Sequence, residues 1–256
     1  MTLQGNRFRD RCKARLKAVW LGSWVILATL AVFGPVTLAA WLEPSQRIAD
    51  WLCKRYARTL LLVAGVKTRS TGVEKIERGR PYAIIVNHQS HFDALALVLE
   101  LPMCIRWVAK KELMRIPLFG LAVASMRNIA VDRSDPLSAR KSLEKGVRRL
   151  PKGASLLFFA EGTRSSDGKV GRFKKGGFWT AREVRWPILP VAVHGSGRLL
   201  PKGSLDFHPG TIEIEVLDPI PAEQVQSMAV DELTERVRRL ILEHSETREA
   251  TSHAAL

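Results

Sequence analysis

The sequence has little cysteine, and its three cysteines lie far apart. Cys12, Cys53 and Cys104 are separated by 41 and 51 residues, with no C-x-x-C pair and no clustered Cys/His set. Zinc sites and disulfide frameworks need such clusters, so the sequence argues against both. Sparse, scattered cysteines favour a reducing, cytoplasmic environment.

Acidic residues are scarce relative to basic ones. The chain carries 40 Lys and Arg against 25 Asp and Glu, a formal net charge of +15. A surplus of this size predicts a partner of opposite sign: nucleic acid, an anionic membrane or a phosphorylated substrate. With two tyrosines and no recognisable nucleic-acid-binding module, we expect no nucleic acid among the partners.

Charge is missing altogether from one stretch near the N-terminus. Residues 1–17 carry six Lys and Arg and one Asp, whereas Ala18–Leu42 carry none. This run exceeds the ~20 residues that a helix needs to cross a bilayer. A signal peptide is the competing interpretation, but the run is too long for a typical signal core and no small-x-small cleavage site follows before Glu43 and Pro44. We therefore expect the segment to stay in the membrane.

Two topologies are open for this segment. If residues 18–42 cross fully, the rest of the chain lies on the side opposite the basic N-terminus. If the segment breaks near Gly34-Pro35 and re-enters, both ends stay cytoplasmic, and Pro35 permits a break because it removes a helix hydrogen bond. Basic residues on both flanks favour re-entry. The next segment, Arg47–Val63, reads as an amphipathic helix, either at the membrane interface or packed on the core.

From about residue 72, buried strands and helices alternate. Continuous apolar runs are typical of parallel strands covered on both faces. The alternating pattern of Thr211–Val216 indicates a position near an edge, and Pro190 indicates an edge or bulge. The fold class predicted is α/β, with a mixed, largely parallel sheet flanked by helices. The strand candidates are Tyr82–Val86, Ile105–Ala109, Asn128–Val131, Ser155–Ala160, Ile188–Val193 and Thr211–Val216.

The helices and tail complete the expected organisation. Asp135-Pro136 starts a helix, and a last helix covers about Ala222–His244. We expect a basic segment at 1–17, a membrane-associated helical segment at 18–66, a catalytic domain at 67–244 and a flexible polar tail at 245–256. The inner stripe of the Asp135 helix is formed by Ala139, Leu143, Val147 and Leu150.

The most informative motif follows the first buried run of this domain. The segment 87–93 reads Asn-His-Gln-Ser-His-Phe-Asp, with His88 five residues before Asp93. A neutral imidazole can take a proton from an alcohol, and a carboxylate can hold the ring in the right tautomer. On one helix the two side chains would face apart, so His88 must precede a helix that Ser90 caps. The alternative is that Asp93 is only a capping residue.

A second motif and scattered basic residues follow other strands. Residues 158–165 read Phe-Phe-Ala-Glu-Gly-Thr-Arg-Ser, in which Arg164 offers a fork of donors suited to phosphate, Gly162 allows close backbone approach, and Glu161 can orient a cation. The alternative is an ordinary strand-end turn. Lys110 and Arg133 close further strands.

Taken together, these segments resemble the 1-acylglycerol-3-phosphate O-acyltransferase family, the lysophospholipid acyltransferases of bacterial phospholipid synthesis. Four ordered blocks carry the resemblance, over about residues 45–220: the H-x4-D block at 87–93, a Lys–Leu–Pro–Gly block at 110–120 ending in Arg133, the Phe-x-Glu-Gly-Thr-Arg block at 159–165, and an apolar block with a proline at 188–193.

The resemblance implies acyl transfer from acyl-CoA or acyl-carrier protein, used as co-substrate without a further cofactor, to the free hydroxyl of a lysophospholipid. It implies that His88 is the general base and Asp93 its partner. The phosphate would be held by Arg164, Lys110 and Arg133, at a site shaped by Glu161, Gly162 and Thr163. It also implies an inner-membrane enzyme whose catalytic domain faces the cytoplasm.

Other functions remain open from the sequence. The acceptor could be another lysolipid, such as a lyso-ornithine lipid. A non-catalytic basic protein of the membrane or of nucleic acid belongs to a different class, and a His–Asp pair could also activate water in a hydrolase.

Overall fold

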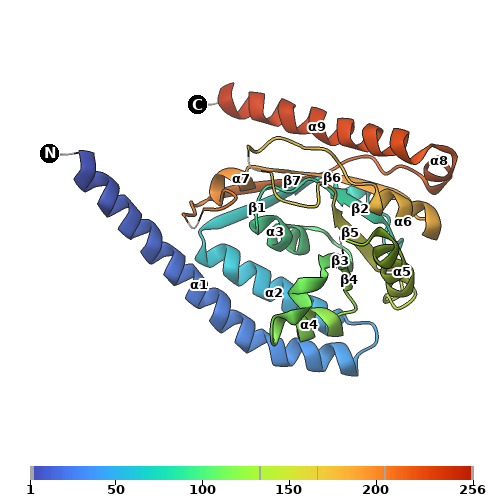
Figure 1. The fold of residues 1–256 in the computed structure, drawn as a ribbon, viewed down its shortest axis with the longest axis horizontal. Helices are drawn as coiled ribbons and strands as arrows, with labels where there is room; N and C mark the ends of the chain where they lie inside the picture. Colours follow the sequence, from blue (N-terminus) through green and yellow to red (C-terminus); the bar gives the residue numbers. More distant parts are fainter. Residues whose placement is uncertain (1–2, 133, 166, 205, 255–256) are drawn as a thin grey trace.

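The computed structural model describes residues 3–132, 134–165, 167–204 and 206–254. A sheet of seven strands lies between two layers of helices (Figure 1). Helices α2 (Arg47–Val63) and α3 (Phe92–Glu100) cover one face, and α5 (Pro136–Val147), α6 (Gly176–Val184) and α9 (Val230–Ala254) cover the other. The long helix α1 (Leu3–Leu42) lies outside the first layer, against α2 and α4 (Phe119–Ser125).

The sheet has the order β1-β7-β6-β2-β5-β3-β4, and its only antiparallel pair among the described strands is β6–β7. The central strands are buried along almost their whole length, as expected for parallel strands covered on both faces. The strands are β1 (Val66–Thr71), β2 (Ala83–Val86), β3 (Ile105–Lys110), β4 (Ile129–Val131), β5 (Ser155–Phe159), β6 (Ile188–His194) and β7 (Gly210–Val216). Short helices complete the chain: η1 (Val73–Lys75), η2 (Lys111–Arg115), α7 (Ser196–Leu199) and α8 (Ala222–Ser227).

All six expected strands are present, and the mixed, largely parallel sheet is confirmed. One strand escaped prediction: β1 precedes residue 72 and pairs with β7 at the edge. The expected edge position of Pro190 is wrong, since β6 lies between β7 and β2. Pro190 is tolerated because its carbonyl accepts from the N–H of Leu217, just past the end of β7. The N–H that proline lacks would point toward β7, as the Pro190 carbonyl does. The missing hydrogen bond therefore falls at the end of the β6–β7 ladder.

Helix α1 corrects the expected break at Gly34-Pro35, because it continues through Pro35 to Leu42. Gly34 and Pro35 are exposed, whereas Val36 and Ala40 are buried against α2 and α4. Val32, which precedes Pro35, packs against the same cluster, so packing on both sides of the proline holds the helix together despite one lost hydrogen bond. The chain reverses instead between Leu42 and Arg47, so α1 and α2 form a helical hairpin.

The Asp135 carboxylate caps α5 by accepting from the N–H groups of Leu137 and Ser138, as predicted.

The C-terminal expectation also needs correction. The predicted last helix is divided into α8 and α9. Residues 245–254, which the sequence assigns to a flexible tail, continue α9 in the structure. This segment contains Glu, Arg and Ala, which are good helix formers.

Helix α2 packs on the domain with one face and exposes apolar side chains on another. Ala57 and Leu61 are buried against the domain, whereas Trp51 and Leu62 are exposed. Apolar side chains therefore lie on both the buried and the exposed face of α2.

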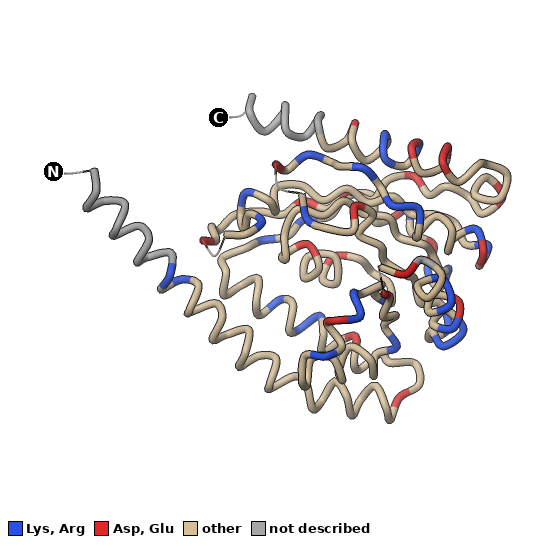
Figure 2. Tube along the Cα trace, in the orientation of Figure 1, with Lys and Arg blue, Asp and Glu red and all other residues tan. Residues whose placement is uncertain are grey.

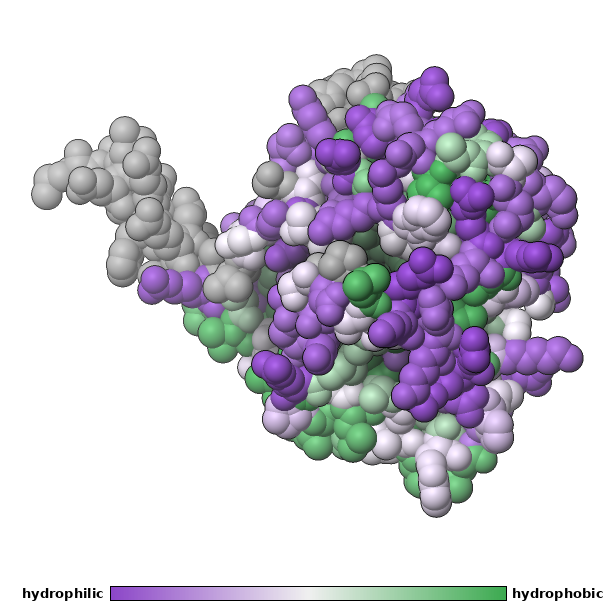
Figure 3. Space-filling model, turned by 45° about the vertical axis from the view of Figure 1, so that its right-hand side comes forward, coloured by the Kyte–Doolittle hydropathy of each residue, from purple (hydrophilic) through white to green (hydrophobic). Residues whose placement is uncertain are grey.

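An apolar surface extends across α1, α2 and α4. Arg15–Leu42 is long and apolar enough to cross a membrane, and only 11% of its apolar window is buried. Beyond Lys17, α1 carries no Lys, Arg, Asp or Glu as far as Leu42, and this stretch is tan in Figure 2. Trp41 is 80% exposed, Trp51 55% and Leu121 58%. Figure 3 shows apolar side chains gathered at the lower end of the molecule, at the level of the α1–α2 turn and α4. Exposed apolar surface of this extent indicates membrane association.

Candidate active site

The carboxyl ends of β2 and β5 bring the two sequence motifs together. These neighbouring strands pair in parallel, so the residues that follow Val86 and Phe159 leave the sheet at the same edge. His88 follows β2, and Asp93 lies in the first turn of α3. The Nδ1 atom of His88 lies 2.8 Å from Oδ2 of Asp93. The predicted pair is therefore present.

This contact sets what the imidazole can do. The Asp93 carboxylate is fully buried, whereas the His88 side chain is 16% exposed. Because the carboxylate accepts the proton on Nδ1, the other ring nitrogen, Nε2, is left with its lone pair free to accept a proton. This geometry is the one that a general base and an orienting carboxylate require.

Asp93 also has the structural role that its sequence position allowed as the alternative, because it bonds backbone N–H groups before α3. The same Oδ2 atom accepts from the backbone N–H groups of Gln89 at 2.8 Å and Ser90 at 2.9 Å. Ser90 is not the N-cap as predicted: α3 begins one residue later, after His91, and the Ser90 hydroxyl donates to the carbonyl of Leu200. The loop bonds hold the carboxylate in place for His88.

The backbone of His88 is fixed by the second motif. Its N–H donates to Oε1 of Glu161 at 2.9 Å, and its carbonyl accepts from the N–H of Ser165 at 2.7 Å. The other Glu161 oxygen accepts from the N–H of Gly171 at 3.1 Å. Glu161 thus bonds backbone donors rather than a side-chain cation, and it ties three loops together. Burial raises the pKa of Glu161, and the two N–H donors oppose that effect.

Sequence reasoning missed the aromatic support of the base. The ring of Phe159 stacks on His88 with centroids 3.7 Å apart, and Trp107 stacks behind Phe159 at 5.7 Å. Asn87 ties the end of β2 to β6, exchanging hydrogen bonds of 2.9 and 2.8 Å with the backbone of Val193. The position of Phe159 in the second motif was the only available signal for this role.

A cavity of about 520 Å³ runs from this site to the helical hairpin. His88 and Arg164 lie among its lining residues, and the opposite part is apolar. That part is lined from α1 by Thr29, Val32, Phe33 and Val36, from α2 by Cys53, Tyr56 and Ala57, from α3 by Ala94, Leu95 and Val98, and from α4 and the residue after it by Phe119, Ala122, Val123 and Met126. We call this cavity the tunnel.

The tunnel also collects most of the predicted phosphate ligands. Lys110, Gly162, Thr163 and Arg164 all line it. Partial burial, followed by the positive charge of Arg164, lowers the pKa of His91, another lining residue. Arg133, the remaining candidate, lies outside the described residues.

Neither a thiol nucleophile nor a metal centre is indicated beside this base. Burial raises the pKa of both Cys53 and Cys104 to about 12, so each stays protonated at neutral pH. In the described part of the chain, no group of three or more His, Cys, Asp or Glu side chains could hold a metal ion.

Comparisons with known proteins agree with this site. The family model described as Acyltransferase matches residues 67–194, which include both motifs. A protein of Pseudomonas aeruginosa named 1-acyl-sn-glycerol-3-phosphate acyltransferase is 36% identical over 198 residues, covering 77% of this chain and 73% of its own length. A Saccharomyces cerevisiae protein of the same name is 30% identical over 217 residues, covering 83% and 71%.

A solved structure has the same fold. The crystal structure of the 1-acyl-sn-glycerophosphate acyltransferase PlsC from Thermotoga maritima matches with a TM-score of 0.80, over 94% of this chain and 98% of the other, at 23% identity. At that identity the likeness establishes the fold alone, and the two sequence relatives carry the assignment further. The chain therefore belongs to the acyltransferase family and is an acyltransferase.

Proposed function

We propose that this protein transfers a fatty acyl group from a thioester donor to the free hydroxyl of 1-acylglycerol 3-phosphate, giving phosphatidic acid. One observation carries the proposal: the tunnel joins the base His88, the guanidinium of Arg164 and an apolar wall that reaches α1. A lysophospholipid needs these three features, for its hydroxyl, its phosphate and its acyl chain. The names of the sequence relatives point to the same acceptor.

The reaction follows from the free Nε2 atom of His88. Nε2 takes the proton of the acceptor hydroxyl as its oxygen attacks the thioester carbonyl. Asp93 stabilises the imidazolium that forms. When the C–S bond breaks, the imidazolium returns its proton to the leaving thiolate. A new ester and a free thiol are the products, and no covalent enzyme intermediate is needed.

The acceptor's phosphate is assigned to Arg164, whose planar fork suits bidentate binding. Lys110 and Thr163 are proposed to assist it, and both also line the tunnel. Gly162 has a φ of 74°, a conformation that favours glycine. A Cβ at this position would lie 2.8 Å from Cε of Lys174, so glycine leaves room for that side chain. Arg133 is proposed to contribute from the sequence pattern alone.

The cellular setting belongs to the same proposal. Basic flanks and the α1–α2 hairpin support an inner-membrane enzyme whose active site faces the cytoplasm, where acyl-CoA and acyl-carrier protein are available. Anionic phospholipids would attract the strongly basic chain.

The test is an acyl transfer assay with purified protein in detergent, offering lysophosphatidate and lyso-ornithine lipid with labelled acyl-CoA or acyl-carrier protein. We expect transfer to lysophosphatidate, and a loss of kcat of about a thousandfold in His88→Ala, as for removal of a general base. The matched control is His208→Ala, which removes a half-exposed histidine far along the chain.

The acceptor is tested by Arg164→Ala in the same assay. Its KM for lysophosphatidate should rise about tenfold or more, with a smaller change for the zwitterionic lyso-ornithine lipid. Unchanged lysophosphatidate kinetics would contradict the phosphate role. Release of free fatty acid as fast as transfer would instead identify a hydrolase.

A further inference from the structure

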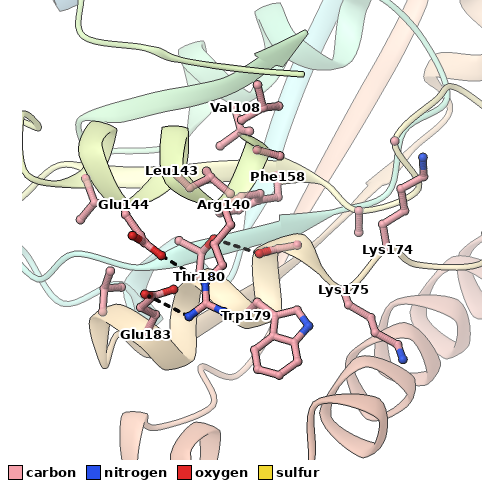
Figure 4. Close-up of a pocket in the computed structure, with 18 of the residues that line it drawn as sticks. Val108, Arg140, Leu143, Glu144, Phe158, Lys174, Lys175, Trp179, Thr180 and Glu183 are labelled. Atoms are coloured by element: carbon pink, nitrogen blue, oxygen red, sulfur yellow. Dashed lines mark hydrogen bonds and ion pairs between the residues drawn. The ribbon is translucent and has the colours of Figure 1, made fainter. Parts of the chain in front are cut away.

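A second cavity, of about 530 Å³, lies on the other face of the sheet, between α5, α6 and the carboxyl ends of β4 and β5. In Figure 4, side chains of α5 and α6 face each other across it, and Lys174 and Lys175 stand beyond them at its other end. Leu143 and Phe158 belong to its apolar wall. Its size and its apolar wall with a polar rim are typical of a small-molecule site. We call it the α5–α6 cleft.

The α5–α6 cleft and the tunnel meet beside His88, the proposed catalytic base. Val108, Phe159 and Gly162 line both cavities. Phe159 is also the residue whose ring stacks on His88. An occupant of the cleft would therefore end against the wall of the catalytic site, on the side away from α1 and α2.

The charged side chains on the rim of the cleft differ in whether they already have an ion-pair partner. Arg140 is paired with Glu144 and Glu183, drawn as dashed lines in Figure 4. Lys175 is paired with Asp231. Within the described ranges, no ion pair is found for Lys174, whose side chain lies against Gly162. Lys174 is thus a cation available to a ligand, beside Gly162, which lines both the cleft and the tunnel.

The proposed reaction needs room for a third group besides the two assigned above. Direct transfer brings the acyl chain, the acceptor hydroxyl and the carrier of the thioester to one carbon atom beside His88. The tunnel accounts for apolar chains, and Arg164 for the acceptor's phosphate. The carrier of a biological thioester is an extended arm with methylene and amide groups that ends in a phosphate. An apolar wall, a polar rim and an unpaired lysine match that chemistry.

We propose that the α5–α6 cleft binds the phosphopantetheine arm of the donor, with Lys174 contacting its phosphate. This inference rests on the proposed function and adds the place of the donor. The arm is shared by coenzyme A and acyl-carrier protein. The competing occupant of the cleft is the head group of the acceptor, and the two predict different kinetic effects.

The test measures donor and acceptor KM separately for wild type and Lys174→Gln, with acyl-CoA, acyl-carrier protein and acyl-pantetheine, which lacks the phosphate. We expect about a tenfold rise in KM for the phosphate-bearing donors. The KM for acyl-pantetheine and for lysophosphatidate should not change. The control Lys141→Gln removes an exposed lysine of α5 that does not line the cleft. A rise for acyl-CoA alone would assign Lys174 to the nucleotide and overturn the phosphopantetheine contact.

A second variant tests the wall rather than the charge. Ala139→Phe fills part of the cleft, so it should raise the KM of acyl-pantetheine as well. Equal donor KM values in both variants and wild type would overturn the inference. A rise in the KM of lysophosphatidate alone would overturn it too, and would give the cleft to the acceptor.

Binding of free coenzyme A, measured by calorimetry, separates this inference from the proposed function. If wild type binds coenzyme A and Lys174→Gln binds it about tenfold more weakly, the cleft assignment holds even where lysophosphatidate proves not to be the acceptor. If wild type acylates lysophosphatidate but both proteins bind coenzyme A equally, the proposed function holds and the cleft assignment falls.

Discussion

At the scale of single residues, the site depends on carboxylates that bond backbone N–H groups. Asp93 accepts two such bonds with the oxygen that also holds His88. Glu161 accepts one from His88 itself and one from Gly171. His88, the proposed base, is thus held at its side chain and at its backbone by two buried carboxylates from different motifs. Because His88 lines the tunnel, fixing its ring in this way orients it before a substrate arrives, so no ordering cost falls at the moment of reaction.

Glu161 should leave a signature in the pH dependence of stability. Because burial raises its pKa above the ordinary value of 4.5, the folded protein binds that proton more tightly than the unfolded chain. Stability is then lost as pH rises from 4.5 through the folded pKa. The free energy of unfolding of wild type minus that of Glu161→Gln should therefore fall across this interval and level off above it.

The measurement is thermal or denaturant unfolding in detergent at a series of pH values. Glu232→Gln, at an exposed position of α9, serves as the control for a change of charge alone. A difference that increases with pH would contradict the assignment, as would one that matches the Glu232 control.

At the scale of elements, the sequence predicts what local pattern controls and misses what packing controls. Buried runs such as Ala83–Val86 were found because both faces are covered. Strand β1 was missed because only one of its faces is buried, so Val66–Thr71 lacks an apolar run. Pro35 suggested a break that packing of Val36 overrides. In the site, the His88–Asp93 pair was predictable from spacing, whereas the stacking of Phe159 depends on which strands become neighbours.

The attachment of α2 to the sheet uses a buried ion pair. Arg106 of β3 is fully buried, and its guanidinium lies 2.8 Å from Oδ1 of Asp50 and 2.8 Å from Oε1 of Gln46. Removing one partner leaves the other charge buried without compensation. Asp50→Ala should therefore lower the free energy of unfolding by about 3 kcal/mol.

Two further variants make this test specific. The double variant Asp50→Ala/Arg106→Met should regain most of the loss, because it removes the stranded charge and fills the space with an apolar side chain. Asp218→Ala breaks the pair with Lys75, in which Asp218 is 89% exposed, and should cost less than about 1 kcal/mol. Equal losses in Asp50→Ala and Asp218→Ala would show that α2 does not depend on this pair.

At the scale of the whole molecule, the exposed apolar surface leads to the tunnel, and the tunnel leads to His88. The exposed faces of α1, α2 and α4 form the surface, and the same three helices line the apolar part of the tunnel. A lipid that enters from the membrane would therefore reach His88 without crossing water. Under the proposed function, the hairpin would have two functions: it would hold the protein at the membrane and set the direction from which lipid arrives.

These two functions can be separated by variants that leave α1 intact. Trp51→Glu/Leu121→Glu places charges on the exposed faces of α2 and α4. Each loses about 1.5 kcal/mol or more of apolar burial in a membrane, so turnover of lysophosphatidate in vesicles should fall at least tenfold. Turnover of the same lipid in detergent micelles should hardly change, because micelles adapt to the altered surface. The control Ser227→Glu/Ala229→Glu adds the same charge near α8, on the other side of the sheet (Figure 1). If the variant and the control show equal turnover in vesicles, α1 alone positions the active site. If the variant loses turnover equally in vesicles and micelles, the two charges disturb the tunnel rather than docking on the membrane.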